Sequence, residues 1–358
     1  MKIFAFHLLN DYSGSPKVLM QLIKGWTKNN IDVHLVTSKG RDGFLSNLDD
    51  VSYHHFWYQW AKNPYLRFIN LTISQLILIF SLWFKVRKDD IIYVNTVLPF
   101  GAGILGKLKG CKVIYHIHET TINPPVFKKM VFGIAKWSGS EVIFVSEFLA
   151  RQEPFENTKT HILYNAIENS FLETASQNRK KTKSPSHVLM VCSLKDYKGV
   201  QEFVQLAQQN LNFNFKLVLN ASQQEIDSYF EAVDRPLNLQ IFHSQTNLHP
   251  FYQWADVILN LSRPHQWVET FGLTIIEGMA YGIPAIVPPV GGITELVQEN
   301  TNGYKVDCRK THLLNEKLNQ LFSQKEKYEQ MIQYNINKIN HYSENSFIRK
   351  NLSILSLL

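Results

Sequence analysis

Residues 261–290, LSRPHQWVETFGLTIIEGMAYGIPAIVPPV, place a strand end, a loop, a helix and a second strand in direct succession. The first strand ends at Leu261, and the polar loop after it carries Glu269. Phe271-Gly272-Leu273 then opens a helix, and Gly282-Ile283-Pro284 ends it, with glycine and proline where helices commonly stop. This order predicts one unit of a parallel α/β sheet.

The same residues are suited to bind an anion. A glycine at position 272 lets the backbone approach a ligand, and the first amides of a helix favour negative charge. Glu277 lies about one turn inside that helix, where a carboxylate can accept hydrogen bonds from ribose hydroxyls, as in dinucleotide-binding folds. The alternative is that Glu269 is a solvated loop acid and that Glu277 stabilises the helix dipole.

Short apolar strands and amphipathic helices alternate on both sides of this stretch, and a polar, basic segment at residues 173–186 separates two halves. We expect strands at residues 2–6, 32–37, 91–94, 112–116, 141–145, 187–192, 216–219, 239–242, 257–261 and 285–287. We expect helices at residues 16–29, 68–84, 200–209, 223–232, 273–281, 313–338 and 343–357. The pattern predicts two Rossmann-like halves that bind ligands at the carboxyl ends of their strands.

Composition narrows the class of protein. The chain has 358 residues, of which 45% are hydrophobic and 19% charged, and this excludes a disordered chain and fits two packed domains. Cys111, Cys192 and Cys308 are too few and too far apart for a disulfide framework or a cysteine-rich metal site. The net charge of +7 favours an anionic partner. We do not expect nucleic acid, because basic and aromatic residues interleave only at residues 57–88.

Glu269 and Glu277, with seven residues between them, followed by Gly282-Ile283-Pro284 and Val290-Gly291-Gly292, resemble the donor-site signature of retaining glycosyltransferases with the GT-B fold. The chain most resembles glycosyltransferase family 4, over nearly its whole length. The other matching segments are Gly14 in the first strand–helix turn, Tyr115-His116-Ile117-His118-Glu119, Val145-Ser146-Glu147, Tyr164-Asn165-Ala166 and Lys198-Gly199.

The resemblance implies a role for each site residue. Glu277 would bind the ribose of the donor nucleotide, and Glu269 would bind sugar hydroxyls near the reacting face. Lys198 would neutralise the diphosphate, and His118 would contact the sugar across the cleft. The other donor-binding groups would be Gly14 and the amides of Phe271, Gly272 and Leu273. His116 stays an alternative to His118, because strand alternation directs both side chains to one face.

The family works without a metal ion or other cofactor, the nucleotide sugar being a substrate, and the sequence shows no DxD-like or His/Cys ligand cluster. Cys192-Ser193-Leu194 replaces the family's Gly-Arg-Leu, so the arginine that assists the lysine is missing at Ser193. Lys195 or Arg263 could compensate. Ser13-Gly14-Ser15 replaces the usual paired glycines. A non-catalytic GT-B-like protein that binds a nucleotide sugar or glycan is therefore the alternative function.

The resemblance implies an α/β GT-B architecture, two Rossmann-like domains facing each other across a deep cleft. Its expected parts are an acceptor-side domain at 1–172, a linker or exposed loop at 173–186, a nucleotide-sugar domain at 187–338, and a C-terminal helix at 339–358 that packs on the N-terminal domain. The expected reaction is retaining transfer from a UDP- or GDP-linked sugar to a glycan or lipid-linked oligosaccharide in bacterial capsule or lipopolysaccharide synthesis.

The N-terminal residues predict a first strand and no signal peptide, so we expect a cytoplasmic protein. The apolar helix expected at residues 68–84 is interrupted by polar residues, which disfavours a membrane span. This helix either packs on the N-terminal sheet or faces an anionic membrane, where flanking basic residues would meet lipid phosphates.

Overall fold

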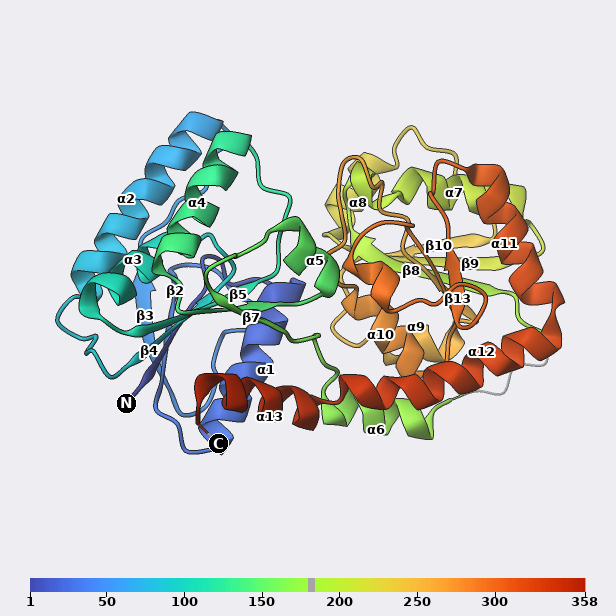
Figure 1. The fold of residues 1–358 in the computed structure, drawn as a ribbon. Helices are drawn as coiled ribbons and strands as arrows, with labels where there is room; N and C mark the ends of the chain where they lie inside the picture. The colour runs from blue at the N-terminus through green and yellow to red at the C-terminus, as the bar shows by residue number, and fades with distance from the viewer. Residues whose placement is uncertain (180–183, 358) are drawn as a thin grey trace. The chain divides into compact units, whose positions relative to one another are not determined.

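The computed structural model describes residues 1–179 and 184–357, which form two compact units (Figure 1). Unit 1 comprises Met1–Asn165 and Asn345–Leu358, and unit 2 comprises Ala166–Glu344. Each unit is a parallel sheet covered by helices, so the predicted α/β class with two Rossmann-like sheets is confirmed.

The sheet of unit 1 has, among the described residues, seven parallel strands in the order β3-β2-β1-β4-β5-β6-β7. They are β1 (Ile3–Phe6), β2 (Val33–Ser38), β3 (Val51–Phe56), β4 (Ile91–Asn95), β5 (Lys112–Ile117), β6 (Glu141–Phe144) and β7 (Lys159–Ile162). The strand order reverses between β1 and β4, and in such sheets the loops beyond the carboxyl ends of the strands at this point bind ligands.

Helices cover both faces of this sheet. They are α1 (Gly14–Lys28), α2 (Pro64–Leu82), α3 (Phe100–Lys109), α4 (Pro125–Ser138), α5 (Glu147–Gln152) and α13 (Glu344–Leu355). The α2, α3 and α4 helices lie side by side on one face, and α1 lies on the other (Figure 1).

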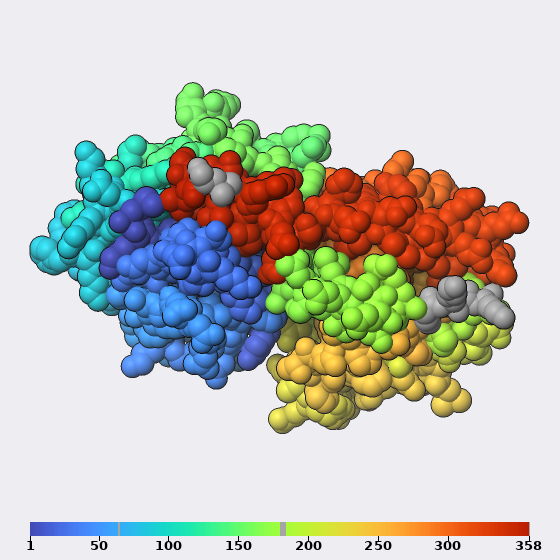
Figure 2. Space-filling view, turned by 90° about the horizontal axis from the view of Figure 1, so that it is seen from below, coloured from blue at the N-terminus to red at the C-terminus, as the bar shows by residue number. Residues whose placement is uncertain are grey.

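The C-terminal helix α13 packs on α1. Gly25 allows this close approach, since a Cβ atom there would lie 2.5 Å from Ile348 Cδ1. The buried Trp26 indole donates a hydrogen bond to Asn351 Oδ1 at 2.9 Å, and Asn351 Nδ2 donates to the Tyr93 hydroxyl at 3.1 Å. Figure 2 shows this C-terminal segment, in red, against the blue N-terminal residues. Unit 1 is therefore built from both ends of the chain.

Unit 2 has, in the part of the chain that the structure describes, six parallel strands in the order β10-β9-β8-β11-β12-β13. The strands are β8 (His187–Ser193), β9 (Asn214–Asn220), β10 (Leu239–Phe242), β11 (Val257–Leu259), β12 (Ala285–Val287) and β13 (Gly303–Lys305). The α-helices are α6 (Asn169–Gln177), α7 (Val200–Gln209), α8 (Gln223–Tyr229), α9 (His249–Trp254), α10 (Leu273–Ala280), α11 (Thr311–Ser323) and α12 (Lys325–Lys338). The short 3₁₀ helices are η1 (Asp196–Lys198), η2 (Gly292–Glu295) and η3 (Ile339–Tyr342).

Several elements differ from the sequence-based expectation. The single helix expected at residues 313–338 is two helices, α11 and α12, which separate at Gln324. The expected linker begins as the second half of helix α6, and residues 180–183 of that linker lie outside the described residues. The β3 strand was not predicted, because its sequence VSYHHF contains two adjacent histidines and does not alternate clearly between apolar and polar residues.

Candidate active site

Lys198 lies at the carboxyl end of β8, in the 3₁₀ turn η1 that leads into helix α7. Gly199 makes this turn possible. Its φ of +77° is a left-handed conformation, and a Cβ atom there would lie 2.2 Å from the Leu261 carbonyl oxygen. The glycine thus fixes Lys198 directly beside the backbone that follows β11.

Glu269 holds Lys198 in a nearly buried ion pair. The Lys198 ammonium donates to Glu269 Oε1 at 2.5 Å, and their side chains are 14% and 15% exposed. Ser262 Oγ and Asn260 Nδ2 donate to the same oxygen at 2.5 and 3.3 Å. Burial alone would raise the pKa of Glu269, but the Lys198 charge and these hydrogen bonds hold it below its ordinary value. Glu269 is therefore ionised at neutral pH.

Two aromatic rings flank this pair. Tyr197 and Trp267 stack with their ring centroids 5.1 Å apart, and the Lys198 ammonium lies 5.9 and 5.0 Å from them. The distances are those of cation–π contacts. The sequence pattern does not indicate either ring, although Trp267 stands only two residues before Glu269.

The helix expected after Glu269 is α10, and it begins at Leu273 with Gly272 as its N-cap. Gly272 has a φ of +132°, and a Cβ atom there would lie 2.8 Å from Ile293 Cγ1. Phe271 is buried at 4% exposure, so its phenyl ring belongs to the core and only its backbone is available for a ligand. The expected amide site at 271–273 is thus placed at a helix N-terminus beside Glu269.

Glu277 lies inside α10 and is 5% exposed. The Tyr252 hydroxyl donates to its Oε2 at 2.6 Å. Burial, and secondarily the Glu277 charge, raise the pKa of Tyr252 well above its ordinary value, so the phenol stays a donor. Tyr252 in turn stacks on Tyr281 at 5.9 Å. The structure therefore gives Glu277 a fixed orientation that the sequence did not reveal.

The two cations proposed to replace the missing arginine are placed differently. Arg263 forms a two-pronged ion pair with Glu202, at 2.6 and 3.1 Å. Lys195 is exposed and precedes η1. Arg263 thus has a carboxylate partner already, whereas Lys195 lies three residues from Lys198 at the surface.

In unit 1, Asn95 at the end of β4 joins the two expected site segments. The His118 Nε2–H donates to Asn95 Oδ1 at 2.9 Å, and Asn95 Nδ2 donates to the Ser15 carbonyl at 3.1 Å, next to Gly14. Gly14 itself is exposed and is the first residue of α1. Asn95 was missed because its contacts lie far away in sequence.

His116 and His118 do share a face, with ring centroids 4.3 Å apart, but their surroundings differ. His116 is fully buried and receives a hydrogen bond at Nδ1 from the Tyr93 hydroxyl at 2.9 Å. Burial and the neighbouring His116 and His7 lower the pKa of His118 well below its usual value, so its ring is neutral at physiological pH. His116 is a core residue, and His118 is the better candidate for a ligand contact.

Glu119 and Thr96 extend this edge of unit 1. The Glu119 carboxylate accepts hydrogen bonds from the amides of Val97 at 2.9 Å and His118 at 3.2 Å. Burial raises its pKa to about 7. Thr96, after β4, has a φ of +73°, which is rare and strained for a β-branched residue. Strained backbone beside a protonatable carboxyl marks this edge as a candidate functional region.

No group of three or more His, Cys, Asp or Glu side chains that could hold a metal ion occurs within residues 1–179 and 184–357. The carboxylates of the site have protein partners instead, Lys198 for Glu269 and Tyr252 for Glu277.

Two family models match the chain and between them cover most of it. The model described as Glycosyltransferase Family 4 matches residues 12–171, and that described as Glycosyl transferases group 1 matches residues 173–338. The fold and site define a GT-B glycosyltransferase that uses a nucleotide-sugar donor. More specifically, the chain belongs to glycosyltransferase family 4, whose members are retaining enzymes and typically need no metal. Membership of an enzyme family decides against the non-catalytic alternative.

Relatives agree with this assignment. N-acetyl-alpha-D-glucosaminyl L-malate synthase of Bacillus anthracis is 25% identical over 89% of this chain and 87% of its own. A 41.2 kDa protein in the cps region of Klebsiella pneumoniae is 22% identical over 66% of this chain and 70% of its own. Among solved structures, Anabaena HepE in complex with UDP and glucose superposes with a TM-score of 0.80 at 18% identity, covering all of both chains. The lipopolysaccharide outer core galactosyltransferase WaaB has a TM-score of 0.74 at 16% identity, also covering both chains fully.

Proposed function

We infer that this enzyme transfers a sugar, with retention, from a UDP- or GDP-linked donor to a glycan or lipid-linked oligosaccharide during bacterial surface-polysaccharide synthesis. The observation that carries the proposal is the Lys198–Glu269 pair at the carboxyl edge of unit 2, beside the N-terminus of α10. The relatives support the finer statement: one is encoded in a cps region, one is a lipopolysaccharide galactosyltransferase, and one was crystallised with UDP.

In this proposal the acidic residues bind hydroxyl groups of the donor, and the basic residue and the helix amides bind its diphosphate. Glu277, oriented by Tyr252, accepts hydrogen bonds from the ribose hydroxyls. Glu269 accepts hydrogen bonds from sugar hydroxyls, while Lys198 and the first amides of α10 stabilise the charge that develops on the departing diphosphate. The leaving phosphate takes the proton of the acceptor hydroxyl, which attacks from the same face. His118 contacts the sugar.

A nucleotide-sugar panel tests the proposal. UDP-, GDP-, ADP- and CMP-linked sugars are compared by thermal unfolding, and a ligand present at 100 times its Kd should add about 2.7 kcal/mol to stability. Proton NMR of the product then shows whether the anomeric configuration is retained. Stabilisation by CMP- or ADP-sugars only, or an inverted product, would refute the proposed donor or reaction.

We also infer that helix α2 rests on an anionic membrane. It is the one helix of the described residues that is long and apolar enough to cross a bilayer, over Tyr65–Leu82, and 28% of that segment is buried. Leu71, Leu78 and Leu82 pack inward, and the buried Gln75 side chain accepts a hydrogen bond from the Gly101 amide at 2.9 Å. Since unit 1 holds one side of α2, the helix is expected to lie on a membrane rather than to span it.

The outward side of α2 is an exposed apolar surface. It is formed by Tyr65, Leu66, Phe68, Ile69, Ile73, Leu76, Ile77, Phe80 and, just past the helix, Phe84. Exposed apolar surfaces of this extent usually bind a partner. The exposed basic residues Lys62, Lys85, Arg87 and Lys88 flank it, and each is worth about 1 kcal/mol near an anionic bilayer and is screened by salt.

Vesicle co-sedimentation at low and high salt tests the membrane contact. Binding should require anionic lipid and weaken with salt, and changing Lys85, Arg87 and Lys88 to Gln should reduce it. The matched control changes Lys24, Lys28 and Lys350, three exposed lysines on α1 and α13, and should bind like the wild type. Equal binding to neutral vesicles, or no binding at all, would exclude the electrostatic contact, and resistance to alkaline carbonate would indicate an inserted segment.

A further inference from the structure

The Asn95 side chain, at the end of β4, determines which nitrogen of the His118 ring carries the proton. It is fully buried, and its two polar atoms have different neighbours. Nδ2 lies 3.1 Å from the Ser15 carbonyl oxygen, and Oδ1 lies 2.9 Å from His118 Nε2. A carbonyl oxygen only accepts hydrogen bonds, so the atom of Asn95 that faces Ser15 must be the amide nitrogen. The atom that faces His118 is therefore the oxygen, and His118 Nε2 carries the proton that it donates.

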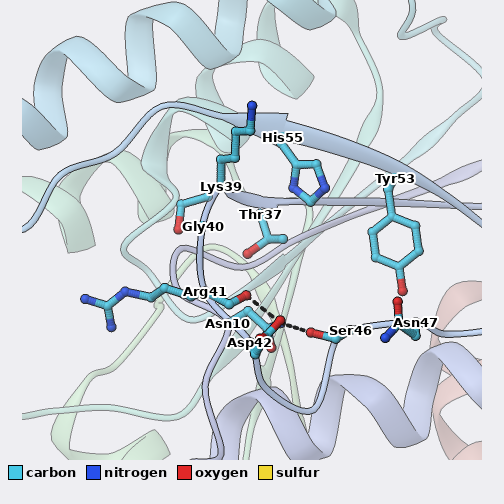
Figure 3. Close-up of a pocket in the computed structure, with 11 residues that line it drawn as sticks. Asn10, Thr37, Lys39, Gly40, Arg41, Asp42, Ser46, Asn47, Tyr53 and His55 are labelled. Atoms are coloured by element: carbon cyan, nitrogen blue, oxygen red, sulfur yellow. Dashed lines mark hydrogen bonds between the residues drawn. The ribbon is translucent and has the colours of Figure 1, made fainter.

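The Ser15 carbonyl can orient this amide because the loop between β1 and α1 is tied to the protein on both sides. Asn10, in that loop, is buried, and its Nδ2 donates to Ser46 Oγ at 2.9 Å and to the Arg41 carbonyl at 3.4 Å (Figure 3). These contacts lie beside a pocket of about 550 Å³ and hold the loop to the segment after β2. The bond from Asn95 holds the start of α1 to the end of β4.

His7 does not change the orientation of the Asn95 amide. Its Nδ1 lies 3.0 Å from Asn95 Nδ2 and 3.2 Å from the Asn95 backbone carbonyl oxygen, so it either accepts from the amide or donates to the carbonyl. Reversing the amide would place Oδ1 3.1 Å from the Ser15 oxygen, and neither protonation state of His7 Nδ1 relieves that repulsion between two acceptors. The observed orientation is thus the one that the backbone requires.

The His118 ring is held in position and kept neutral. It lies against His116, with ring centroids 4.3 Å apart, and the Tyr93 hydroxyl holds His116 through Nδ1. Burial and the neighbouring His116 and His7 keep the pKa of His118 well below its usual value. A neutral imidazole with its proton on Nε2 has no proton on Nδ1, and this nitrogen can accept a hydrogen bond but cannot donate one.

We propose that Asn95 is a positioning residue that keeps His118 in the Nε2–H tautomer, so that Nδ1 meets the donor sugar as a hydrogen-bond acceptor. The proposal rests on the function inferred above, in which His118 contacts the sugar. The direction of this hydrogen bond affects specificity, because a sugar hydroxyl can donate to Nδ1 whereas a fluorine or an ether oxygen in its place cannot.

Nitrogen NMR of the histidine rings measures the tautomer without any substrate. The protein is labelled with ¹⁵N-histidine, and the His118 resonances are assigned by their loss in His118→Gln. The wild type should show a neutral His118 ring with its proton on Nε2, and Asn95→Leu should show a mixture of both tautomers, because Leu offers Nε2 no acceptor. A proton on Nδ1 in the wild type, or an unchanged Nε2–H tautomer in Asn95→Leu, would overturn the proposal.

Asn351→Leu is the matched control for Asn95→Leu. Asn351 is also a fully buried asparagine of unit 1, and its side chain bonds Trp26 and Tyr93. Both variants should lose stability, but only Asn95→Leu should change the His118 tautomer and lower kcat/KM for the nucleotide sugar, roughly tenfold. If both variants lose activity to the same extent, Asn95 acts through stability alone and the proposal fails.

Asn95→Asp keeps an oxygen before His118 Nε2 and adds a negative charge, so the pKa of His118 should rise above its wild-type value. The other titratable groups that face His118 are His7, His116 and the Glu119 carboxylate, and both proteins contain them. The same resonances measure this pKa, and an unchanged value would show that residue 95 does not contact the ring. If the wild type turned over no nucleotide sugar, the proposed function would fail, while the tautomer measurements would still test the role of Asn95.

Discussion

Lys198 and Glu269 depend on one another because both are nearly buried. The carboxylate compensates the lysine in the absence of a donor, and the diphosphate would add a second anion to the same ammonium group. Removing only one partner of such a pair destabilises the folded protein, because the other charge stays buried without an opposite charge. A single substitution at either residue therefore changes both the stability and the activity of the protein. A double substitution that removes both charges is needed to distinguish the two effects.

Lys198→Ala is expected to lower turnover by ~10²-fold or more, because the cation that faces the leaving diphosphate is lost. It should also destabilise the protein by about 3–5 kcal/mol, since Glu269 remains buried without its partner. Urea unfolding and initial rates measure the two effects.

The double variant Lys198→Ala/Glu269→Gln separates the two effects. It should recover most of the stability and none of the activity. The matched control is Lys195→Ala, which removes an exposed lysine three residues earlier and should keep the stability and the activity of the wild type. Recovery of activity in the double variant would remove Lys198 from the reaction.

Glu277→Gln should leave the fold intact and weaken nucleotide binding by about 1–2 kcal/mol, because neutral hydrogen bonds replace charge-assisted ones. Tyr252→Phe should weaken binding less, since it removes only the group that orients Glu277. Calorimetry with the nucleotide that binds best measures both. An unchanged affinity in Glu277→Gln would place the ribose elsewhere.

Glu119 predicts a pH-dependent stability. Burial raises its folded-state pKa from 4.5 to about 7, so the folded protein holds this proton more tightly than the unfolded chain does. The stabilisation is complete below pH 4.5 and is lost as the pH rises to 7, by up to about 3 kcal/mol. Glu119→Gln should therefore gain stability relative to the wild type between pH 5 and pH 8.

Urea unfolding of both proteins at each pH measures this gain. The pKa values of the buried His7 and His116 are lowered to about 4 and about 3, so these groups make the protein more stable as the pH rises. Both proteins contain them, so their contribution cancels in the comparison. Glu147→Gln, an exposed acid on α5, is the control and should show no such change. A constant difference between Glu119→Gln and the wild type would show that Glu119 is ionised throughout this range.

At the scale of residues, the local pattern predicted the site residues of one contiguous segment, and the family resemblance added Lys198 and His118. Neither indicated Asn95, which contacts His118. Glu269, Gly272 and Glu277 lie in one loop and helix, so their spacing alone is informative. Asn95 ends β4, whereas its partner His118 follows β5, the next strand of the sheet. No local pattern encodes such a meeting before the strand order and register are known.

At the scale of elements, a glycine sets the position of the turn that carries Lys198. Substitution by alanine measures how strongly the backbone and its neighbours require that glycine. Gly199 and Gly40 both have left-handed backbone, with φ of +77° and +87°. An alanine Cβ at 199 would meet the Leu261 carbonyl at 2.2 Å, whereas at 40 nothing lies within 4 Å. The pair thus separates backbone strain from steric overlap.

Gly40→Ala should cost about 1–2 kcal/mol through backbone strain alone. Gly199→Ala should cost more and should lower kcat, because the overlap displaces the turn that carries Lys198. Thermal unfolding and steady-state kinetics measure the pair. Equal destabilisation in both variants would mean that the turn relaxes freely and does not position Lys198.

Helix and strand boundaries followed the apolar periodicity where it was strong, as in α7 and β10, which match the expected ranges. The periodicity also runs through Gln324, so it could not reveal the break between α11 and α12. The β13 strand has three residues, too few for any pattern. Tertiary packing, not local preference, fixes these elements.

At the scale of the whole molecule, the two units differ in how the chain builds them: unit 1 consists of two separate segments and unit 2 of one. Unit 2 is one continuous segment, Ala166–Glu344, with its own core of Phe203, Phe215 and Tyr304. Unit 1 needs α13, whose Asn351 bonds the buried Trp26 and Tyr93. Unit 1 therefore cannot complete its fold until the residues of unit 2 have been synthesised.

This asymmetry predicts how fragments behave. Residues 166–344 should unfold cooperatively on their own, whereas residues 1–165 should be less stable than unit 1 in the full chain, because the α1 surface around Gly25 and Trp26 is uncovered. A peptide of residues 344–357 should restore the lost stability, and the same peptide with Asn351→Leu should restore less, since it leaves the Trp26 indole without its acceptor, at about 1–3 kcal/mol. Circular dichroism during heating measures each combination. If residues 1–165 are as stable alone as with the peptide, α13 contributes nothing to the core of unit 1.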